Sequence, residues 1–81
     1  MELSIQLFGI FKERIGEEKI SISTPSSINS SELKALLEVK YDIVKEVQHY
    51  MLAVNQVYSG DRIVALNDND EIALIPPVAG G

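Results

Sequence analysis

The chain has 81 residues and a mass of 8.9 kDa, which suits one small domain and leaves no room for a second. Twelve Asp and Glu residues against seven Lys and Arg give a net charge of −5, which disfavours nucleic acid and anionic membranes as partners. The absence of cysteine excludes disulfide frameworks, thiolate zinc sites and cysteine nucleophiles.

The sequence shows no sign of export or of a membrane anchor. Charged residues are spread through its beginning, so no signal-peptide pattern is present, and no apolar run approaches the roughly 20 residues of a membrane span. We therefore expect a cytoplasmic protein. A basic surface on a partner protein suits the acidic net charge better than a lipid surface does.

The beginning of the chain predicts two strands separated by a short charged segment. Apolar and polar residues alternate over residues 1–8 and again over residues 18–23, which is the period of half-buried strands. Gly9 ends the first run, and residues 10–15 predict about one helical turn that Gly16 closes. We expect the two strands to pair antiparallel.

The clearest helix start in the chain lies at Asn29. Its side chain suits an N-cap, and Glu32 stands three residues later, where it completes a capping box. Ile28 and Leu33 occupy the positions of a hydrophobic staple around this start. An apolar face continues at spacings of three and four, and the helix is expected to end within residues 40–42.

The second half of the chain predicts strands, at residues 51–54, 57–58 and 71–75. A polar loop over residues 67–70 precedes the last strand, and we expect Asn69 to adopt the left-handed backbone conformation there. No pattern dominates between residues 41 and 51. The order of elements predicts an α+β fold, with a mixed sheet of four to five strands and one main helix on one face.

Side chains that carry chemistry are sparse. His49 has no serine or cysteine partner that its spacing would bring near, so we expect a surface histidine. The acidic residues within 68–71 lack the glycine and closing glutamate of a calcium loop, which favours a solvated turn. We expect no metal site.

The end of the sequence is its most informative part. We expect residues 1–75 to form the domain and residues 76–81 to form an extended tail, made of Pro76, Pro77, Val78, Ala79, Gly80 and Gly81. Proline has no backbone N–H, so the sheet ladder must stop where the tail begins. The two glycines lack Cβ atoms, so another protein's catalytic groups can approach the terminal carboxylate closely.

A terminal carboxylate becomes a good electrophile once a partner enzyme has converted it to an acyl-adenylate. Attack by sulfide then gives a thiocarboxylate, whereas attack by an amine gives an isopeptide bond. Both reactions need an unhindered glycine at the end of the chain, and Gly81 fits that requirement. The residues alone leave open a sulfur carrier, a protein modifier and a plain interaction domain.

The chain resembles, over essentially all 81 residues, the small sulfur-carrying subunit of molybdopterin synthase, a member of the ubiquitin-like β-grasp group. The resemblance rests on residues 7–13, on residues 52–55 and above all on residues 70–81, which end in PPVAGG. The paired prolines separate this ending from the thiamine-pathway carrier and from ubiquitin. The chain departs from the family by having Asn69 in place of glycine and Lys12 in place of arginine.

This resemblance implies that an adenylating, E1-like enzyme uses ATP to activate Gly81 and that a sulfur donor protein supplies the sulfur of a thiocarboxylate. The tail then enters the large synthase subunit, where sulfur passes to cyclic pyranopterin monophosphate during molybdenum cofactor biosynthesis. Family members form a heterotetramer of small and large subunits. The resemblance also implies that the catalytic side chains lie in the large subunit and that no cofactor stays bound to this chain. The alternatives are a ubiquitin-like modifier and a sulfur carrier for thiamine synthesis or tRNA thiolation.

The β-grasp analogy also predicts a docking surface. Its first and last strands lie side by side and parallel, so if Leu7 and Leu74 face the helix, Phe8 and Ile75 turn outward at the same end of the sheet. Exposed apolar pairs are candidate docking sites. We expect the large subunit to bury Phe8, Ile75 and Val78; the alternative is that Phe8 packs under the short helical segment that follows it.

Overall fold

The computed structural model describes residues 1–58 and 62–77. Its elements follow one another in the order β1 (Glu2–Leu7), α1 (Gly9–Ile15), β2 (Lys19–Ser23), β3 (Ile28–Asn29), α2 (Ser30–Lys40), α3 (Asp42–Glu46), β4 (Met51–Val54), β5 (Val57–Tyr58), β6 (Ala65–Leu66) and β7 (Ile72–Ile75). No helix in the described part of the chain is long and apolar enough to cross a membrane.

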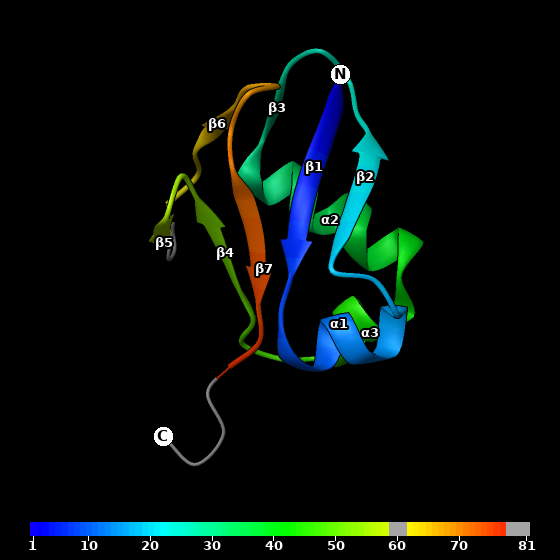
Figure 1. Cartoon of the computed structure of the whole chain (residues 1–81). Helices are drawn as coiled ribbons and strands as arrows, with labels where there is room; N and C mark the ends of the chain where they lie inside the picture. Colours follow the sequence, from blue (N-terminus) through cyan, green and yellow to red (C-terminus); the bar gives the residue numbers. More distant parts are fainter. Residues whose placement is uncertain (59–61, 78–81) are drawn as a thin grey trace.

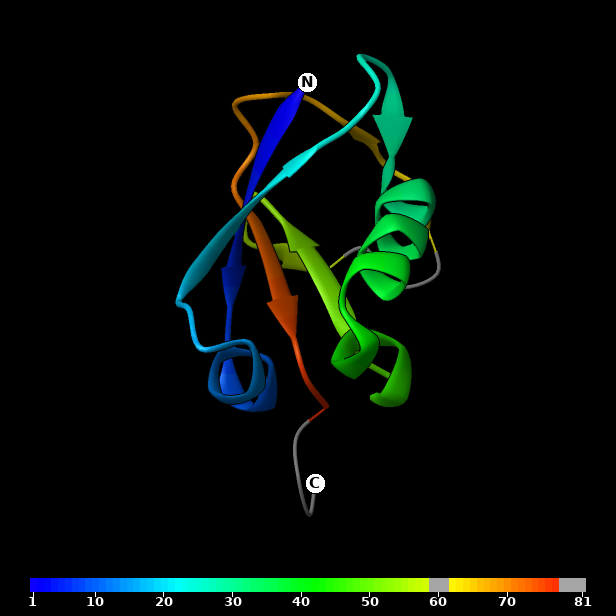
Figure 2. The same cartoon turned by 90° about the vertical axis from the view of Figure 1, so that its right-hand side faces the viewer.

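Five of the strands form a mixed sheet in the order β2-β1-β7-β4-β5 (Figure 1). The neighbours β1 and β7 run parallel, and the other three pairs in this sheet are antiparallel. Helix α2 lies against one face of the sheet, and α1 and α3 lie at the end where β1 and β7 finish (Figure 2). The expected α+β fold, with one main helix on a sheet of four to five strands, is confirmed.

The start of the chain follows its alternating pattern. In β1 and β2 the apolar residues are buried and the polar residues exposed, and the two strands pair antiparallel as predicted. Helix α1 buries Phe11 and ends at Gly16, which has φ +84° and donates its N–H to the Lys12 carbonyl oxygen over 2.9 Å. The left-handed conformation at Gly16 closes the helix, since glycine adopts it without steric cost.

The predicted capping box at the start of α2 is present. The Asn29 Oδ1 atom accepts a hydrogen bond from the Glu32 N–H over 2.8 Å, and Glu32 Oε1 accepts one from the Asn29 N–H over 3.0 Å. The helix ends at Lys40, within the predicted range. Its buried Leu33 and Leu37 pack into the core beneath the sheet, together with Ile28 from β3.

Three elements, α3, β3 and β6, were not predicted. Helix α3 has five residues, lacks a side-chain cap and buries only Val44 fully, so it leaves little periodic signal in the sequence. Strands β3 and β6 form a separate two-stranded sheet in which Ile28 pairs with Leu66. The adjoining backbone of Val64 bonds to Ser30, with the Val64 N–H donating to Ser30 Oγ over 3.0 Å. Such pairing between distant two-residue strands has no local sequence signature.

The prediction that Asn69 is left-handed was wrong. The described non-glycine residues with positive φ are His49, Asn55 and Gln56. The loop before β7 closes through the Asp70 N–H, which donates to the Asn67 carbonyl oxygen over 3.1 Å. The Asp70 carboxylate also accepts from the Asn67 N–H over 2.7 Å, so the turn is held by side-chain and backbone bonds and needs no left-handed residue.

Candidate functional site

The tail leaves the domain at the end of a central strand. Strand β7 ends at Ile75, Pro76 is half-buried and Pro77 is exposed. The remaining predicted tail residues, Val78, Ala79, Gly80 and Gly81, lie outside the described residues. The structure therefore describes the base of the tail and the surface around it.

The register of the two parallel strands sets the neighbours of this exit. Leu7 pairs with Leu74, and both side chains are buried in the core. Because side chains alternate along a strand, the next residues, Phe8 and Ile75, turn to the opposite face of the sheet. Phe8 is 41% exposed and Ile75 is half-buried. Phe8 caps α1 through its backbone, whose carbonyl oxygen accepts from the Phe11 N–H, while its side chain stays accessible.

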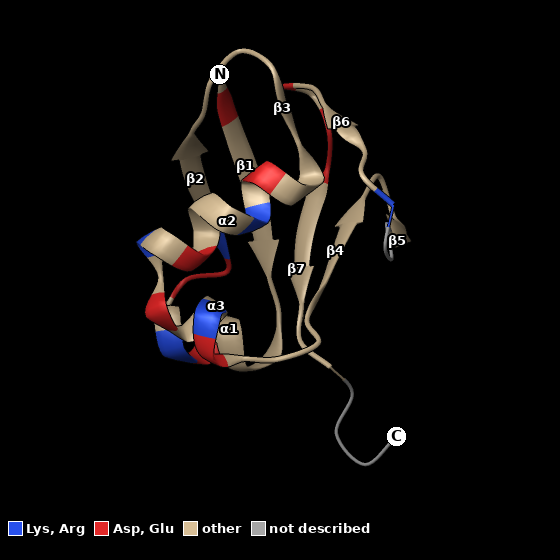
Figure 3. Cartoon of the chain, turned by 180° about the vertical axis from the view of Figure 1, so that it is seen from behind, with Lys and Arg blue, Asp and Glu red and all other residues tan. Residues whose placement is uncertain are grey.

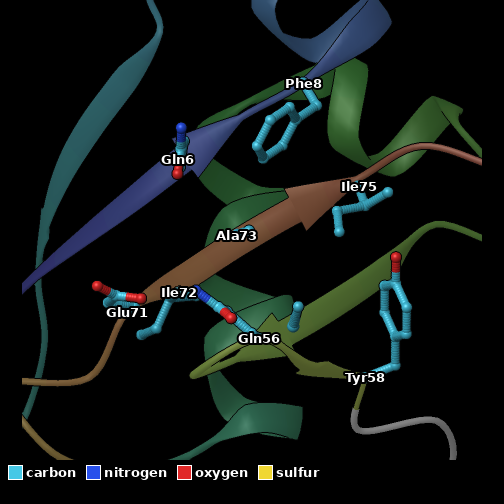
Figure 4. Close-up of a pocket in the computed structure, with 9 residues that line it drawn as sticks. Gln6, Phe8, Gln56, Tyr58, Glu71, Ile72, Ala73 and Ile75 are labelled. Atoms are coloured by element: carbon cyan, nitrogen blue, oxygen red, sulfur yellow. The ribbon is translucent and has the colours of Figure 1, made fainter.

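Phe8 and Ile75 line a shallow pocket on the face of the sheet opposite α2 (Figure 4). Its lining comes from four strands and adjoining turns: Gln6, Phe8, Ala53, Gln56, Tyr58, Glu71, Ile72, Ala73 and Ile75. Figure 4 shows Phe8, Ile75 and Tyr58 gathered at the end near the tail, with Gln6, Gln56 and Glu71 at the other end. The pocket thus has an apolar half at the tail exit and a polar half away from it.

Charge is unevenly distributed around the molecule. Strands β4, β5 and β7 contain no charged residue, whereas the three helices carry most of the charged side chains (Figure 3). Glu71, just before β7, is the acidic side chain that borders the pocket. A surface of this kind, with exposed apolar residues next to polar ones and few charges, has the composition of a protein interface.

Tyr58 was not predicted as part of this surface, although the sequence contains a signal for it. The turn at Asn55 and Gln56 has positive φ at both residues, which is the geometry of a tight two-residue hairpin. This hairpin pairs Tyr58 with Ala53, whose side chain lies on the outer face. Combining the hairpin register with strand alternation would have placed Tyr58 on the same face of the sheet as Ile75, level with Ala53 and Ala73.

The other side chains considered in the sequence analysis, His49 and the acidic residues of the loop before β7, lie in turns. His49 is exposed, as expected, and stands in a turn with φ +62°. Both oxygens of the Asp70 carboxylate accept hydrogen bonds, one from Asn55 Nδ2 over 3.0 Å and one from the Asn67 N–H. Among the residues that the structure describes, no three His, Asp or Glu side chains converge to hold a metal ion.

The known proteins to which this chain is similar include sulfur carrier subunits and small archaeal modifier proteins. The ThiS family matches residues 5–81. A molybdopterin synthase sulfur carrier subunit from Dictyostelium discoideum is 40% identical over 83 residues, which cover 99% of this chain and 96% of that protein. The small archaeal modifier protein 3 of Haloferax volcanii is 30% identical over 95 residues, covering all of both chains.

A solved structure extends the likeness to the fold. The protein–protein complex of subunits 1 and 2 of the molybdopterin-converting factor from Helicobacter pylori contains a chain that is 30% identical, with a TM-score of 0.69 and full coverage of both chains. This agreement supports the ubiquitin-like β-grasp assignment of the mixed sheet and its helices. The chain belongs to the ThiS family, in which its relatives include molybdopterin synthase sulfur carrier subunits.

Proposed function

We propose that this chain is the sulfur-carrying subunit of a molybdopterin synthase. The observation that carries the proposal is the 40% identity, over almost the whole of both chains, with the Dictyostelium discoideum subunit of that name. The fold supports it, because central strand β7 leads directly into the two prolines and small residues of the sequence PPVAGG. Two prolines cannot extend the sheet ladder, and glycines without Cβ atoms let the catalytic groups of a partner protein approach the terminal carboxylate.

The reactive group in this proposal is the Gly81 carboxylate. A carboxylate oxygen attacks the α-phosphorus of ATP on an E1-like activating enzyme, which releases pyrophosphate and leaves an acyl-adenylate. A sulfide equivalent from a sulfur donor protein then attacks the acyl carbon and releases AMP, leaving a thiocarboxylate. ATP belongs to the activating enzyme, and this chain needs no permanently bound cofactor.

Transfer of the sulfur takes place in the large subunit. The tail residues Pro76 to Gly81 enter its active site. The thiocarboxylate sulfur attacks a side-chain carbon of cyclic pyranopterin monophosphate and displaces an oxygen leaving group from it. Water then cleaves the acyl–sulfur bond of the resulting thioester, which leaves the sulfur on the pterin and restores the Gly81 carboxylate. The catalytic side chains belong to the large subunit, in a heterotetramer of two small and two large chains. Support for such a partner comes from the Helicobacter pylori structure, in which subunit 1 is bound to subunit 2.

Docking uses the apolar half of the pocket at the tail exit. Phe8 and Ile75 project from adjacent parallel strands on a face that no described helix covers. Burying an exposed aromatic ring of this kind in a partner pocket is a common source of binding energy in interfaces. Val78, three residues beyond Ile75 in the tail, is the third proposed docking residue.

Reconstituted synthesis tests the proposal. The chain is combined with the large subunit, the activating enzyme, ATP, a sulfur source and cyclic pyranopterin monophosphate, and the molybdopterin formed is measured. We expect product from the complete mixture and none from a variant that lacks Gly81. A Val39→Ala variant, altered at an exposed position on α2, serves as the control and should match the unaltered chain. Full synthesis by the variant without Gly81 would contradict the proposal.

A ubiquitin-like modifier is the second candidate. It is favoured by the 30% identity with small archaeal modifier protein 3 over the whole of both chains. In that case the activated Gly81 would be attacked by lysine amines, giving branched adducts on other proteins. Mass spectrometry of proteins from cells that express the chain separates the two functions, because only a modifier leaves such adducts.

A further inference from the structure

The first residue of the tail, Pro76, lies against Gly9, the first residue of helix α1. Gly9 has φ +54°, and a Cβ atom built on it would lie 2.8 Å from Pro76 Cγ. The contact continues the parallel register, since Gly9 and Pro76 each stand two residues beyond the Leu7–Leu74 pair. Gly9 thus meets two requirements at once: a left-handed backbone and the absence of a side chain where the proline ring lies.

The contact between Gly9 and Pro76 lies just beyond the last hydrogen-bonded pair of β1 and β7. The parallel pairing of β1 with β7 reaches Leu7 and Leu74, and Pro76 has no N–H with which to extend it. Pro76 is nevertheless half-buried, whereas Pro77 is exposed. Because the Pro76 ring packs on the Gly9 backbone, this contact fixes the orientation of Pro76, the first residue after β7.

We propose that Gly9 is a positioning residue for the tail, which sets the direction in which residues 77–81 leave the domain. The inference rests on the proposed function, because the direction matters only if the tail must reach a partner's active site. Five residues can span at most about 17 Å, and over that length a tilt of about 10° at Pro76 would displace the reactive end by about 3 Å. Transfer rates are sensitive to displacements of about 1 Å.

The chain contains its own matched control. Gly16 also has a left-handed backbone, with φ +84°, but a Cβ atom there would meet nothing within 4 Å. Alanine at either position therefore introduces the same kind of backbone strain, and alanine at position 9 alone also pushes against Pro76. We expect the melting temperature to fall in both variants, by about 5–10 °C.

The first experiment is a double-mutant cycle on Gly9→Ala and Pro76→Ala, with Gly16→Ala as the control. Each thiocarboxylated variant is mixed with the large subunit and cyclic pyranopterin monophosphate, and the single-turnover sulfur-transfer rate and the Kd for the large subunit are measured. We expect Gly9→Ala to lower the rate by about ten- to a hundredfold without a comparable change in Kd. When residue 76 is already alanine, which lacks Cγ, Gly9→Ala should cost no more than Gly16→Ala does.

The second experiment does not depend on sulfur chemistry or on a stable Gly9 variant. Residual dipolar couplings and heteronuclear NOEs of the Val78, Ala79 and Gly80 amides are compared between the unaltered chain, Pro76→Ala and Pro77→Ala. We expect Pro76→Ala to change the amide orientations more than Pro77→Ala does, because Pro77 is exposed. Equal effects of the two proline variants would overturn the inference.

The outcomes separate the inference from the proposed function. If the unaltered chain transfers no sulfur, the proposed function fails, and the amide measurements still decide whether the packed Pro76 ring orients the tail. If the unaltered chain is active and Gly9→Ala has the same sulfur-transfer rate as Gly16→Ala, the positioning role is wrong. Additivity of Gly9→Ala and Pro76→Ala in the cycle would contradict it equally.

Discussion

Leu7 and Leu74 pair directly across the parallel strands β1 and β7, and both are fully or almost fully buried. This one relationship fixes the geometry of the tail exit. It turns Phe8 and Ile75 to the outer face, and it places Gly9 beside Pro76 at the end of the sheet. The core of the domain and the proposed docking surface are therefore two sides of the same pair of strands.

Replacing Phe8 with aspartate should weaken binding to the large subunit and leave the domain folded. The side chain is exposed at the tail exit, so a charge there is solvated in the free chain but would be buried in the complex. We expect Kd to rise by about thirtyfold or more, measured by calorimetry. Val39→Asp, a substitution at an exposed apolar residue on α2, is the matched control and should leave Kd unchanged. An unchanged Kd for Phe8→Asp would exclude this docking surface.

Asn55→Ala should destabilise the domain more than any other substitution in the turns next to the pocket. Asn55 has φ +53°, its Nδ2 donates to Asp70 and its Oδ1 accepts from the Glu71 N–H over 2.9 Å. Alanine loses both side-chain bonds and is strained at that φ, so we expect a loss of about 2–3 kcal/mol in the free energy of unfolding. Denaturant titration measures it.

Two controls separate the contributions of Asn55. Asn55→Gly keeps the left-handed conformation and loses only the hydrogen bonds, so it should lie between alanine and the unaltered chain. Asn69→Ala, at an exposed position with no left-handed backbone, should change stability by less than about 0.5 kcal/mol. A larger effect for Asn69 than for Asn55 would contradict this account of the turn.

Loss of the capping box should weaken α2 without affecting the docking surface. Asn29→Ala removes the acceptor for the Glu32 N–H, and such losses cost about 1 kcal/mol. For a domain of this size the melting temperature should fall by about 4–8 °C, which scanning calorimetry measures. Ser31→Ala, two residues after Asn29 and exposed, should have little effect. Equal melting temperatures for Asn29→Ala and Ser31→Ala would show that the cap contributes nothing.

Tyr50 should make stability depend on pH in the alkaline range. Partial burial raises the pKa of its hydroxyl above the ordinary value, and the hydrogen bond to Glu38 and the charge of that carboxylate add to the effect. Above a pH of about 10 the unfolded chain releases this proton while the folded chain retains it, so the free energy of unfolding falls as pH rises. Below that range the contribution is complete.

Tyr50→Phe supplies the comparison for the alkaline titration. It removes the 2.6 Å hydrogen bond to Glu38 but keeps a ring that can pack edge-on against Phe11. At neutral pH we expect the variant to be less stable by about 1 kcal/mol. The difference should narrow above a pH of about 10 in urea titrations, whereas a constant difference from pH 7 to 11 would contradict the role given to Tyr50.

Much of the fold could be predicted because its signals are local. The capping box needs only Asn29 and Glu32, and the burial of Leu7 and Leu74 follows from alternation within single strands. Helix α3 was missed because one fully buried residue, Val44, creates no periodicity. Asn69 was assigned the wrong backbone conformation because the side chain of a neighbouring residue closes the turn instead.

In the candidate site too, the residues specified by local patterns could be predicted and the contacts between distant residues could not. Phe8 and Ile75 were reached from the sequence because strand alternation and a fold analogy together specify their face; their role in docking stays a prediction. The contact between Gly9 and Pro76 could not be predicted, since it joins residues far apart in sequence through a backbone angle and a packing distance. The tail residues 78–81 lie outside the described part of the chain, so their role also stays a prediction.

The intact mass of the chain after activation tests the central claim most directly. The chain is incubated with the activating enzyme, ATP and a sulfur source, and the peptide that follows the last tryptic site, Arg62, is then analysed. We expect the chain and this peptide to gain the mass difference between one sulfur and one oxygen atom, located at Gly81. An unchanged mass under conditions in which the enzyme consumes ATP would contradict the claim that the end of this chain carries sulfur.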